Sequence, residues 1–285
     1  MFVFHPASVV PAESSLIHFV GAIFHPLFVV LATVLAAMYG LTASYGLAIV
    51  LLTVVVMALV MPLTIRSTRS MLALQRLQPR ISRLQQKYKG VENREKLNRE
   101  LLRVYKEEGV NPAGGCLPLL VQMPILLVLY DVIKGLTNRL VTMVQGHLVA
   151  VAQPRYIPTS SRMYHQLIAS HGAMSWAGVD LALRPFSAHA QWFGVLPYLA
   201  LVLVAVGLQY VQLAQMRKRS PASTQSNPQV QTVQKFLPIL YASIYLVVPG
   251  ALVLYMIVST AIRIGTQFVL FRRETDEPPP STVPA

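Results

Sequence analysis

Arg263 has the most unusual chemical setting in this sequence, because it lies inside an apolar run that ends at a basic pair only at residue 272. A guanidinium at bilayer depth costs roughly 2.5 to 17 kcal/mol, depending on its access to water. At helical spacing, one face of this run carries Met256, Thr260, Arg263 and Gln267. Such a polar face points toward other helices or water rather than lipid. We therefore expect Arg263 to face a hydrated groove; the alternatives are snorkelling to the cytoplasmic headgroups or pairing with a carbonyl oxygen.

Residues suited to catalysis or metal binding are few. The single cysteine, Cys116, excludes an internal disulfide and a cysteine-based metal cluster. The four histidines between residues 147 and 189 lack the spacing of metal ligands. There is no H-E-x-x-H motif, and Asp131 has no second intramembrane aspartate as a partner. We expect neither an enzyme nor a bound cofactor or metal.

The composition is that of a membrane protein. Hydrophobic residues make up 54% of the 285 and charged residues only 12%, and the mean hydropathy is +0.52. Soluble domains carry about 25% charged residues. Several apolar runs approach the ~20 residues that a helix needs to cross a hydrocarbon core. They predict an all-α membrane protein with a bundle of five transmembrane helices, at residues 45–65, 116–136, 192–214, 236–249 and 250–271.

Basic residues set the expected orientation of these helices. None occurs in residues 1–65, whereas Lys and Arg crowd between Arg66 and Lys106 and recur at 217–219 and 272–273. The positive-inside rule places these clusters in the cytoplasm. The N-terminus is then outside and the C-terminus inside. The external segments are 1–44 and 137–191, and the cytoplasmic segments are 66–115, 215–235 and 272–285.

Two segments fit a five-helix topology less directly. The fourth span, residues 236–249, would be only roughly 21 Å long, which requires tilt, snorkelling or a thinned bilayer. The apolar run 16–38 is interrupted by His18, His25 and Pro26. We interpret it as an external helix in the membrane interface or partly re-entrant, because no positive charge precedes it to hold a cytoplasmic N-terminus. A sixth span is the alternative.

The cytoplasmic segment 66–115 is expected to form an amphipathic helical hairpin. Apolar residues recur at helical spacing on both sides of a turn at "KGVEN". Pro79 predicts a kink in the first helix. One stripe, which we call the basic face, consists of Arg69, Arg76, Arg80, Arg83 and Lys87. This face either rests near anionic lipid headgroups or docks ribosomal RNA or a targeting partner.

Three stretches of the sequence carry the pattern of a known family. They are "MPLTIRSTRSMLALQRLQPRISRLQQKY", "EEGVNPAGGCLPLLVQMPILLVLYDVIKGL" and "NPQVQTVQKFLPILYASIYLVVPGALVLYMIVS". The agreeing residues of the second are Asn111, Pro112, Gly114, Gly115, Cys116, Pro118, Gln122, Pro124, Leu129 and Tyr130. These stretches resemble the YidC-type membrane protein insertases, relatives of the mitochondrial Oxa and thylakoid Alb proteins. The resemblance covers nearly all of the five spans and the hairpin, but the first 40 residues and the external loop only loosely.

The resemblance implies a five-helix bundle around a hydrophilic groove in the bacterial inner membrane. The groove opens to the cytoplasm and to lipid and is closed on the outer side. An arginine in the first span attracts the acidic tail of a small nascent membrane protein, which is inserted alone or beside the Sec translocon. The family uses no cofactor. A ribosome is a further possible partner, although the tail "ETDEPPPSTVPA" is short and not basic, which argues against strong binding.

This sequence departs from the family pattern at one position. Counting back five residues from Pro62 places the groove arginine of the family at Met57. Met57 and Arg263 each lie nine residues before a basic residue, Arg66 or Arg272, and so roughly 13 Å above the cytoplasmic ends of their helices. We hypothesise that the groove cation has moved from the first span to the fifth. The expected groove residues are Arg263, Gln122, Thr260, Gln267, Met57, Thr53 and Met256.

Two other function classes compete with an insertase. A polar groove in a membrane protein also suits a small-solute transporter or channel, although transporters commonly contain inverted repeats and none relates the first two spans to the last two. The second alternative is a chaperone that helps membrane proteins assemble without inserting them.

Overall fold

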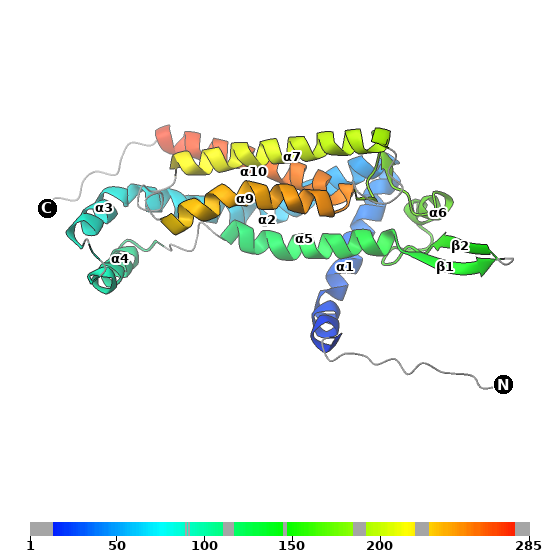
Figure 1. Cartoon of the computed structure of the whole chain (residues 1–285), viewed down its shortest axis with the longest axis horizontal. Coiled ribbons are helices and arrows are strands. Elements are labelled where there is room, and N and C mark those ends of the chain that lie inside the picture. Colours follow the sequence, from blue (N-terminus) through cyan, green and yellow to red (C-terminus); the bar gives the residue numbers. More distant parts are fainter. Residues whose placement is uncertain are drawn as a thin grey trace.

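The apolar runs of the sequence form long helices, in which the backbone groups are hydrogen-bonded within the helix except at its two ends, as a lipid environment requires. The computed structural model describes residues 14–88, 90, 92–110, 117–144, 147–184, 192–219 and 228–276. The helices that run lengthwise beside one another are α2 (Tyr45–Arg76), α5 (Leu117–Leu136), α7 (Trp192–Arg219), α9 (Pro228–Val247) and α10 (Gly250–Asp276) (Figure 1). The protein is therefore mostly helical, as predicted.

Within the described residues, four stretches of helix are long and apolar enough to cross a membrane: His25–Thr42, Tyr45–Arg76, Val195–Arg217 and Gly250–Arg272. The apolar part of α9, Pro238–Val247, is shorter. The whole of α9 nevertheless has 20 residues, because it begins at Pro228, eight residues before the predicted fourth span. The apolar run is thus short, whereas the helix that contains it is not. The first turns of α9 contain polar residues, so an apolar run in the sequence does not mark where this helix begins.

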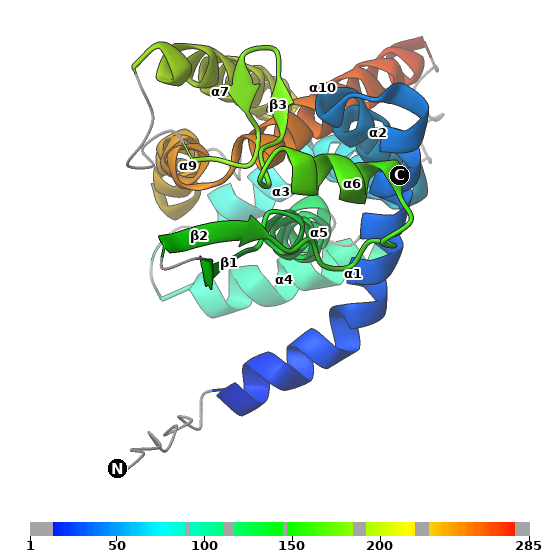
Figure 2. The same cartoon turned by 90° about the vertical axis from the view of Figure 1, so that its right-hand side faces the viewer.

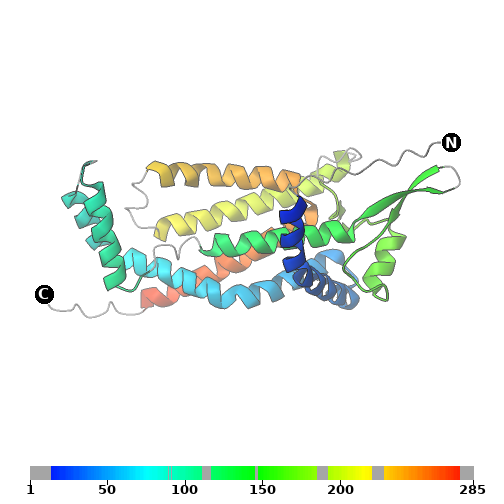
Figure 3. The same cartoon turned by 90° about the horizontal axis from the view of Figure 1, so that it is seen from below.

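Helix α1 (Ser14–Thr42) lies across the bundle rather than along it (Figures 1 and 3). It packs against α2, α5 and α6, with Leu35 and Ala32 fully buried in that contact. Its other side exposes Val30 and Leu41. An apolar helix without charges can lie within the membrane plane, which is the orientation predicted for residues 16–38.

A small folded region closes one end of the bundle, which we call the cap end. It contains β1 (Arg139–Val144) paired with β2 (His147–Ala152), then α6 (Arg162–Ala169), and β3 (Ser175–Trp176) paired with β4 (Val179–Asp180) (Figure 2). Both pairs are antiparallel. These strands are absent from the all-α prediction, which treated residues 137–191 as a loop. The β-branched residues of "RLVTMV" and "HLVAVA" are the signal that was missed.

Residues 153–184, which we call the cap, are anchored to the helices. The core of the cap is formed by Met163, Leu167, Met174 and Leu181, all fully buried. The backbone N–H groups of Gly250 and Ala251 donate to the carbonyl oxygens of Leu183 and Leu181, at 3.1 and 2.9 Å. The first N–H groups of a helix have no acceptor within that helix. The cap therefore completes the start of α10.

The opposite end, which we call the basic end, carries α3 (Gln78–Lys87) and α4 (Arg94–Glu107) (Figures 1 and 3). Helix α2 continues to Arg76, well past the predicted end of the first span at residue 65. The helix ends there, and Leu77 separates it from α3. The break agrees with the predicted effect of Pro79, which cannot donate a helical hydrogen bond and instead lies in the first turn of α3. Arg80 then joins α3 to Glu107 and Glu108, at 3.0 and 2.9 Å.

The main core lies where the long helices meet α1 and the cap. Leu52 of α2, Val132 of α5 and Leu252 of α10 are fully buried there. Helix α10 packs most closely against α2 and α7. Several predicted features lie outside the described residues: Cys116, residues 1–13, part of the loop 215–235, and the tail beyond Asp276.

Candidate functional site

Arg263 lies inside the protein rather than on its surface. Only 8% of its surface is exposed, and its Nε has no hydrogen-bond partner within the described residues. No carboxylate of the described segments forms an ion pair with it. Thr260 and Gln267, one turn away on either side, are also buried, and Thr260 Oγ1 and Gln267 Oε1 likewise have no partner there. The polar face predicted from the sequence is therefore an internal face.

Three tyrosines stand within electrostatic range of the Arg263 guanidinium: Tyr255 of α10, and Tyr241 and Tyr245 of α9. Tyr245 and Tyr255 are fully buried, and Tyr241 is half-buried. The sequence analysis missed all three. Tyr241 and Tyr245 are four residues apart, so they share one face of a helix, and each has a polar hydroxyl. This spacing was the available signal for a second polar face.

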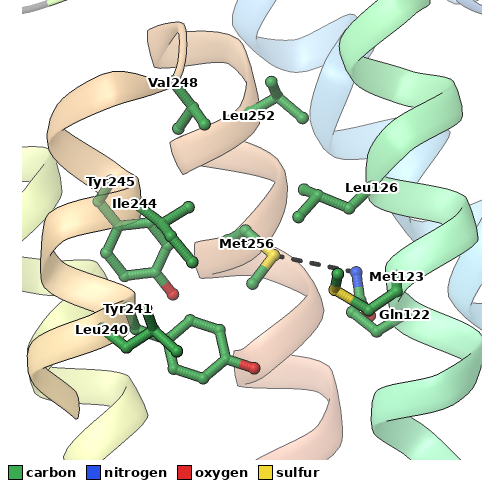
Figure 4. Close-up of a pocket in the computed structure, with 10 residues that line it drawn as sticks. All are labelled: Gln122, Met123, Leu126, Leu240, Tyr241, Ile244, Tyr245, Val248, Leu252 and Met256. Atoms are coloured by element: carbon green, nitrogen blue, oxygen red, sulfur yellow. Dashed lines mark hydrogen bonds between the residues drawn. The ribbon is translucent and has the colours of Figure 1, made fainter. Parts of the chain in front are cut away.

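A cavity of about 280 Å³ lies between α5, α9 and α10 (Figure 4). Its lining is Gln122, Met123, Leu126, Leu240, Tyr241, Ile244, Tyr245, Val248, Leu252 and Met256. Met123 and Leu240 are exposed at the bundle surface, so the cavity opens on the side that lipid would cover. It is mainly apolar, whereas the resemblance implied a hydrophilic groove. The buried polar residues lie beside this cavity, one to three turns along α10 from Met256.

Gln122 links two helices at the cavity wall. Its Nε2 donates to the hydroxyl of Tyr255 at 3.1 Å and lies 3.8 Å from the sulfur of Met256. Figure 4 shows the contact with Met256 as a dashed line. The structure thus brings together two of the residues predicted to line the groove, Gln122 and Met256, from α5 and α10.

The predicted groove residues of α2 are buried against α10. Met57 is 3% exposed, and Thr53 is fully buried with its hydroxyl donating to Ile49 O at 2.6 Å. One turn further, the hydroxyl of Thr266 lies 3.5 Å from the sulfur of Met61. Helices α2 and α10 are in extensive contact. Thr53 has its hydrogen bond within its own helix, so its contribution here is packing.

The five residues of the basic face are exposed at the basic end. A cleft of about 360 Å³ between α3 and α4 has Arg80, Arg83, Lys87 and Arg103 among its lining residues. Glu100 and Glu107 also line it, and Glu107 bridges both Arg80 and Arg103. The cleft is therefore of mixed charge.

Comparison with known proteins assigns the family. Residues 37–277 match the family model described as "60Kd inner membrane protein". The chain belongs to this family. Membership agrees with the resemblance to YidC-type insertases and with a multi-pass membrane protein.

Named relatives support the same assignment. The chain is 34% identical to "Inner membrane protein ALBINO3, chloroplastic" of Arabidopsis thaliana over 80% of this chain and 46% of that protein. It is 50% identical to "Membrane protein insertase YidC" of Clostridium perfringens over 35% of this chain and 41% of that protein. A crystal structure of an active YidC insertase with its first transmembrane domain resolved matches with a TM-score of 0.54 and 22% identity, over 87% of this chain and 46% of that one.

The likeness to the solved insertase concerns the fold alone. The chain spans about half the length, or less, of the relatives that it matches. Met57, where the resemblance predicts that the family has its groove arginine, is a buried apolar side chain of α2. Arg263, from the neighbouring α10, is a buried cation in the same bundle.

Proposed function

We propose that this protein is an insertase and chaperone for small integral membrane proteins, with Arg263 as the cation of its client groove. The observation that carries the proposal is a buried guanidinium without a carboxylate partner in the described bundle. A buried charge is costly unless it is paired or hydrated. A buried charge of this kind within a membrane protein marks a binding site, and here its partner would be an acidic group of the client.

The arrangement lowers the barrier to moving a polar tail through lipid. An acidic tail that enters the bundle meets the Arg263 guanidinium in a medium of lower dielectric than water, where attraction is strong. The apolar part of the client then leaves between α5 and α9, where Met123 and Leu240 flank the cavity. Burial of that client helix in lipid, at about 25 cal/mol per Å² of apolar surface, drives the insertion to completion. No bond is made or broken.

The proposed topology has five spanning helices, α2, α5, α7, α9 and α10, with the cap end outside and the basic end in the cytoplasm. The exposed basic face supports this orientation. Helix α1 lies in the outer interface, consistent with its direction across the bundle (Figure 1). Proposed partners are nascent membrane proteins, the Sec translocon, the ribosome and anionic lipids, the last two through the basic face.

The test is insertion by purified protein in liposomes without ATP. The client is a short single-span protein with an acidic tail, and the readout is protection of that tail from external protease. We expect Arg263→Ala to slow this insertion about tenfold, the equivalent of about 1.4 kcal/mol in the barrier. Arg263→Ala/Met57→Arg should recover much of the rate by returning a cation to α2. Arg263→Lys should be intermediate, because a point charge replaces a planar fork.

Arg99→Ala is the matched control, because it removes an exposed arginine that pairs with Glu95 in α4. Its insertion rate should equal that of the wild type. Full activity of Arg263→Ala would remove the proposed role of this residue. Client contacts without protease protection would instead favour an assembly chaperone, and movement of a small solute would favour a transporter.

A further inference from the structure

Tyr130 holds two basic side chains together near the end of α5. Arg184 Nη2 donates to the Tyr130 hydroxyl at 3.0 Å, and the Lys134 ammonium lies 4.8 Å from the centroid of the Tyr130 ring. Lys134 and Arg184 are exposed, whereas Tyr130 is half-buried. Arg184 lies at the end of the cap, 54 residues from Tyr130 in the sequence. Two separate segments thus bring two positive charges to one place. We call Lys134 and Arg184 the cap-end pair.

The cap-end pair lies next to the apolar cavity between α5, α9 and α10. Leu126 lines the cavity and precedes Tyr130 by about one turn of α5. On the other side, Leu183 precedes Arg184 and accepts a hydrogen bond from the Gly250 N–H, at the start of the helix that forms another wall of the cavity. The pair is therefore connected to two of the three helices around the cavity.

The cavity is open to lipid and carries no charge of its own. None of the ten described residues that line it is charged, and Met123 and Leu240 are exposed at the bundle surface. In Figure 4, Val248 and Leu252 lie at one end of the cavity and Tyr241 lies toward the other. Val248 and Leu252 flank the turn into α10, which is hydrogen-bonded to the cap, so theirs is the end near the cap-end pair. An occupant would thus be apolar, with any negative charge at that end.

The dimensions match one leaflet of a membrane. Met123 and Lys134 are eleven residues apart on α5, which is roughly 17 Å along the helix. Half of a hydrocarbon core is about 15 Å thick. An engineered apolar cavity of about 150 Å³ binds benzene, so a cavity of about 280 Å³ has room for roughly a dozen carbon atoms. A phospholipid has both parts, an apolar chain of this length and a phosphate at one end of it.

We propose that an anionic phospholipid binds at this place, with its phosphate at Lys134 and Arg184 and one acyl chain in the cavity. The guanidinium and the ammonium only donate, and the Tyr130 hydroxyl still has a proton to donate, so a phosphate can satisfy all three. Asp131 is the only acidic residue of α5, so the cap-end pair keeps a net positive charge beside it. The inference goes beyond the proposed function, because it concerns a lipid at the opposite end from the basic face and requires no client.

The apolar side chains of a client helix are the alternative occupant of the cavity. Such side chains have no need of two cations at the rim, whereas a phospholipid uses both the cations and the apolar walls. Lipid also surrounds this opening at all times, and a client is present only during insertion. The bound lipid fills the opening between α5 and α9 until a client displaces it.

Photo-crosslinking of the whole chain in phosphatidylcholine nanodiscs tests the headgroup contact. The probe is phosphatidylglycerol with a diazirine on one acyl chain, compared with a phosphatidylcholine probe that has the same chains. Peptide mass spectrometry should find the label on cavity residues of α5 and α9, about tenfold more from phosphatidylglycerol. A basic residue near a membrane surface strengthens anionic-lipid binding about fivefold, so Lys134→Gln and Arg184→Gln should each lower phosphatidylglycerol labelling by about that factor. Arg162→Gln, at an exposed arginine of α6, is the control and should change neither labelling.

Filling the cavity tests the position of the acyl chain. Val248→Phe places a larger side chain in the cavity and should lower labelling from both probes about tenfold, with the preference for phosphatidylglycerol retained. Leu126→Phe fills the cavity from α5 and should do the same. Val247→Phe is the matched control, because Val247 is 60% exposed on α9 and does not line the cavity. Labelling of the lipid-facing surface of α7, at the exposed Leu203, is the internal reference for a folded protein.

Three results would overturn the inference. Equal labelling of the wild-type cavity by the two probes would show that the headgroup is not recognised. Unchanged labelling in both Lys134→Gln and Arg184→Gln would place the phosphate elsewhere. Unchanged labelling in both Val248→Phe and Leu126→Phe would place the acyl chain outside the cavity and leave the cavity to client side chains. A protein that gives the expected labelling but inserts no client would contradict the proposed function alone.

Discussion

At the scale of single residues, the protein keeps a cation and its surrounding polar groups where an ordinary membrane helix has apolar side chains. Arg263, Thr260 and Gln267 are all buried, and each has an atom without a partner in the described chain. In contrast, the amide nitrogen of Gln122 links α5 to α10, through the Tyr255 hydroxyl and the Met256 sulfur. We infer that the first group of residues serves a ligand and that Gln122 serves the bundle.

This difference gives a prediction for Gln122→Leu. The substitution removes the donor to the Tyr255 hydroxyl and leaves a polar atom in an apolar wall. Hydrogen bonds between membrane helices contribute about 0.6 to 2 kcal/mol. Thermal unfolding in detergent should therefore show a lower midpoint for Gln122→Leu. The dependence of insertion on an acidic tail should be retained. A loss of that dependence at unchanged stability would assign Gln122 to the client site.

Helical spacing in the sequence was enough to predict that Arg263, Thr260 and Gln267 share a face, because those positions belong to one element. The burial of that face is now a structural observation. The spacing of Tyr241 and Tyr245 indicates only that they share a face of α9, and their placement toward α10 was not predictable in the same way. It depends on the pairing of α9 with α10 and on the lean of side chains in antiparallel helices, which are properties of the packed bundle. The roles assigned to these residues stay predictions.

At the scale of elements, the cap fixes the ends of the helices around the cavity. Tyr198 of α7 places its hydroxyl 2.8 Å from Tyr245 O and 2.7 Å from Val248 O, at the end of α9. The start of α10 is bound to the cap backbone at Leu181 and Leu183. Carbonyls at a helix end otherwise lack partners. The cap and Tyr198 thus hold α9 and α10 together at the end that we place outside.

Gly46 provides a test of the cap. A Cβ on this residue of α2 would lie 2.2 Å from Cδ2 of Trp176 in β3. Gly46→Ala should displace Trp176, make the cap more sensitive to protease added from outside and lower the thermal midpoint. Gly40→Ala in α1 is the matched control, because nothing lies within 4 Å of its Cβ position. It should be neutral or slightly stabilising, by up to about 1 kcal/mol. Equal protease sensitivity of the two variants would mean that the cap does not depend on this contact.

Element boundaries were predicted less well than element positions. Helices α2, α7 and α10 continue beyond the apolar runs to Arg76, Arg219 and Asp276. A helix does not end where lipid ends, because its hydrogen bonds persist in water. Hydropathy therefore locates a membrane segment but not the helix that contains it.

At the scale of the whole molecule, positive charge is concentrated at one end. The net charge is +13, and the basic face together with Arg94, Lys96, Arg99 and Arg103 lies at the basic end, which α3 and α4 form. The cap end, with its small strands, α6 and buried apolar core, carries fewer basic residues, namely Arg139, Arg155, Arg162 and Arg184. Two ends of such different character favour a single orientation in the membrane.

That orientation can be measured with single cysteines in a Cys116→Ser background. Ser160→Cys lies in the exposed part of the cap, and Lys87→Cys lies at the end of α3. A maleimide that cannot cross membranes should label Ser160→Cys on intact cells. It should label Lys87→Cys only after the cells are made permeable, because the positive-inside rule holds the basic end in the cytoplasm. Labelling of Lys87→Cys on intact cells would reverse the topology. The site at Arg263 would then face the outer side of the membrane rather than the cytoplasm, where client proteins are synthesised.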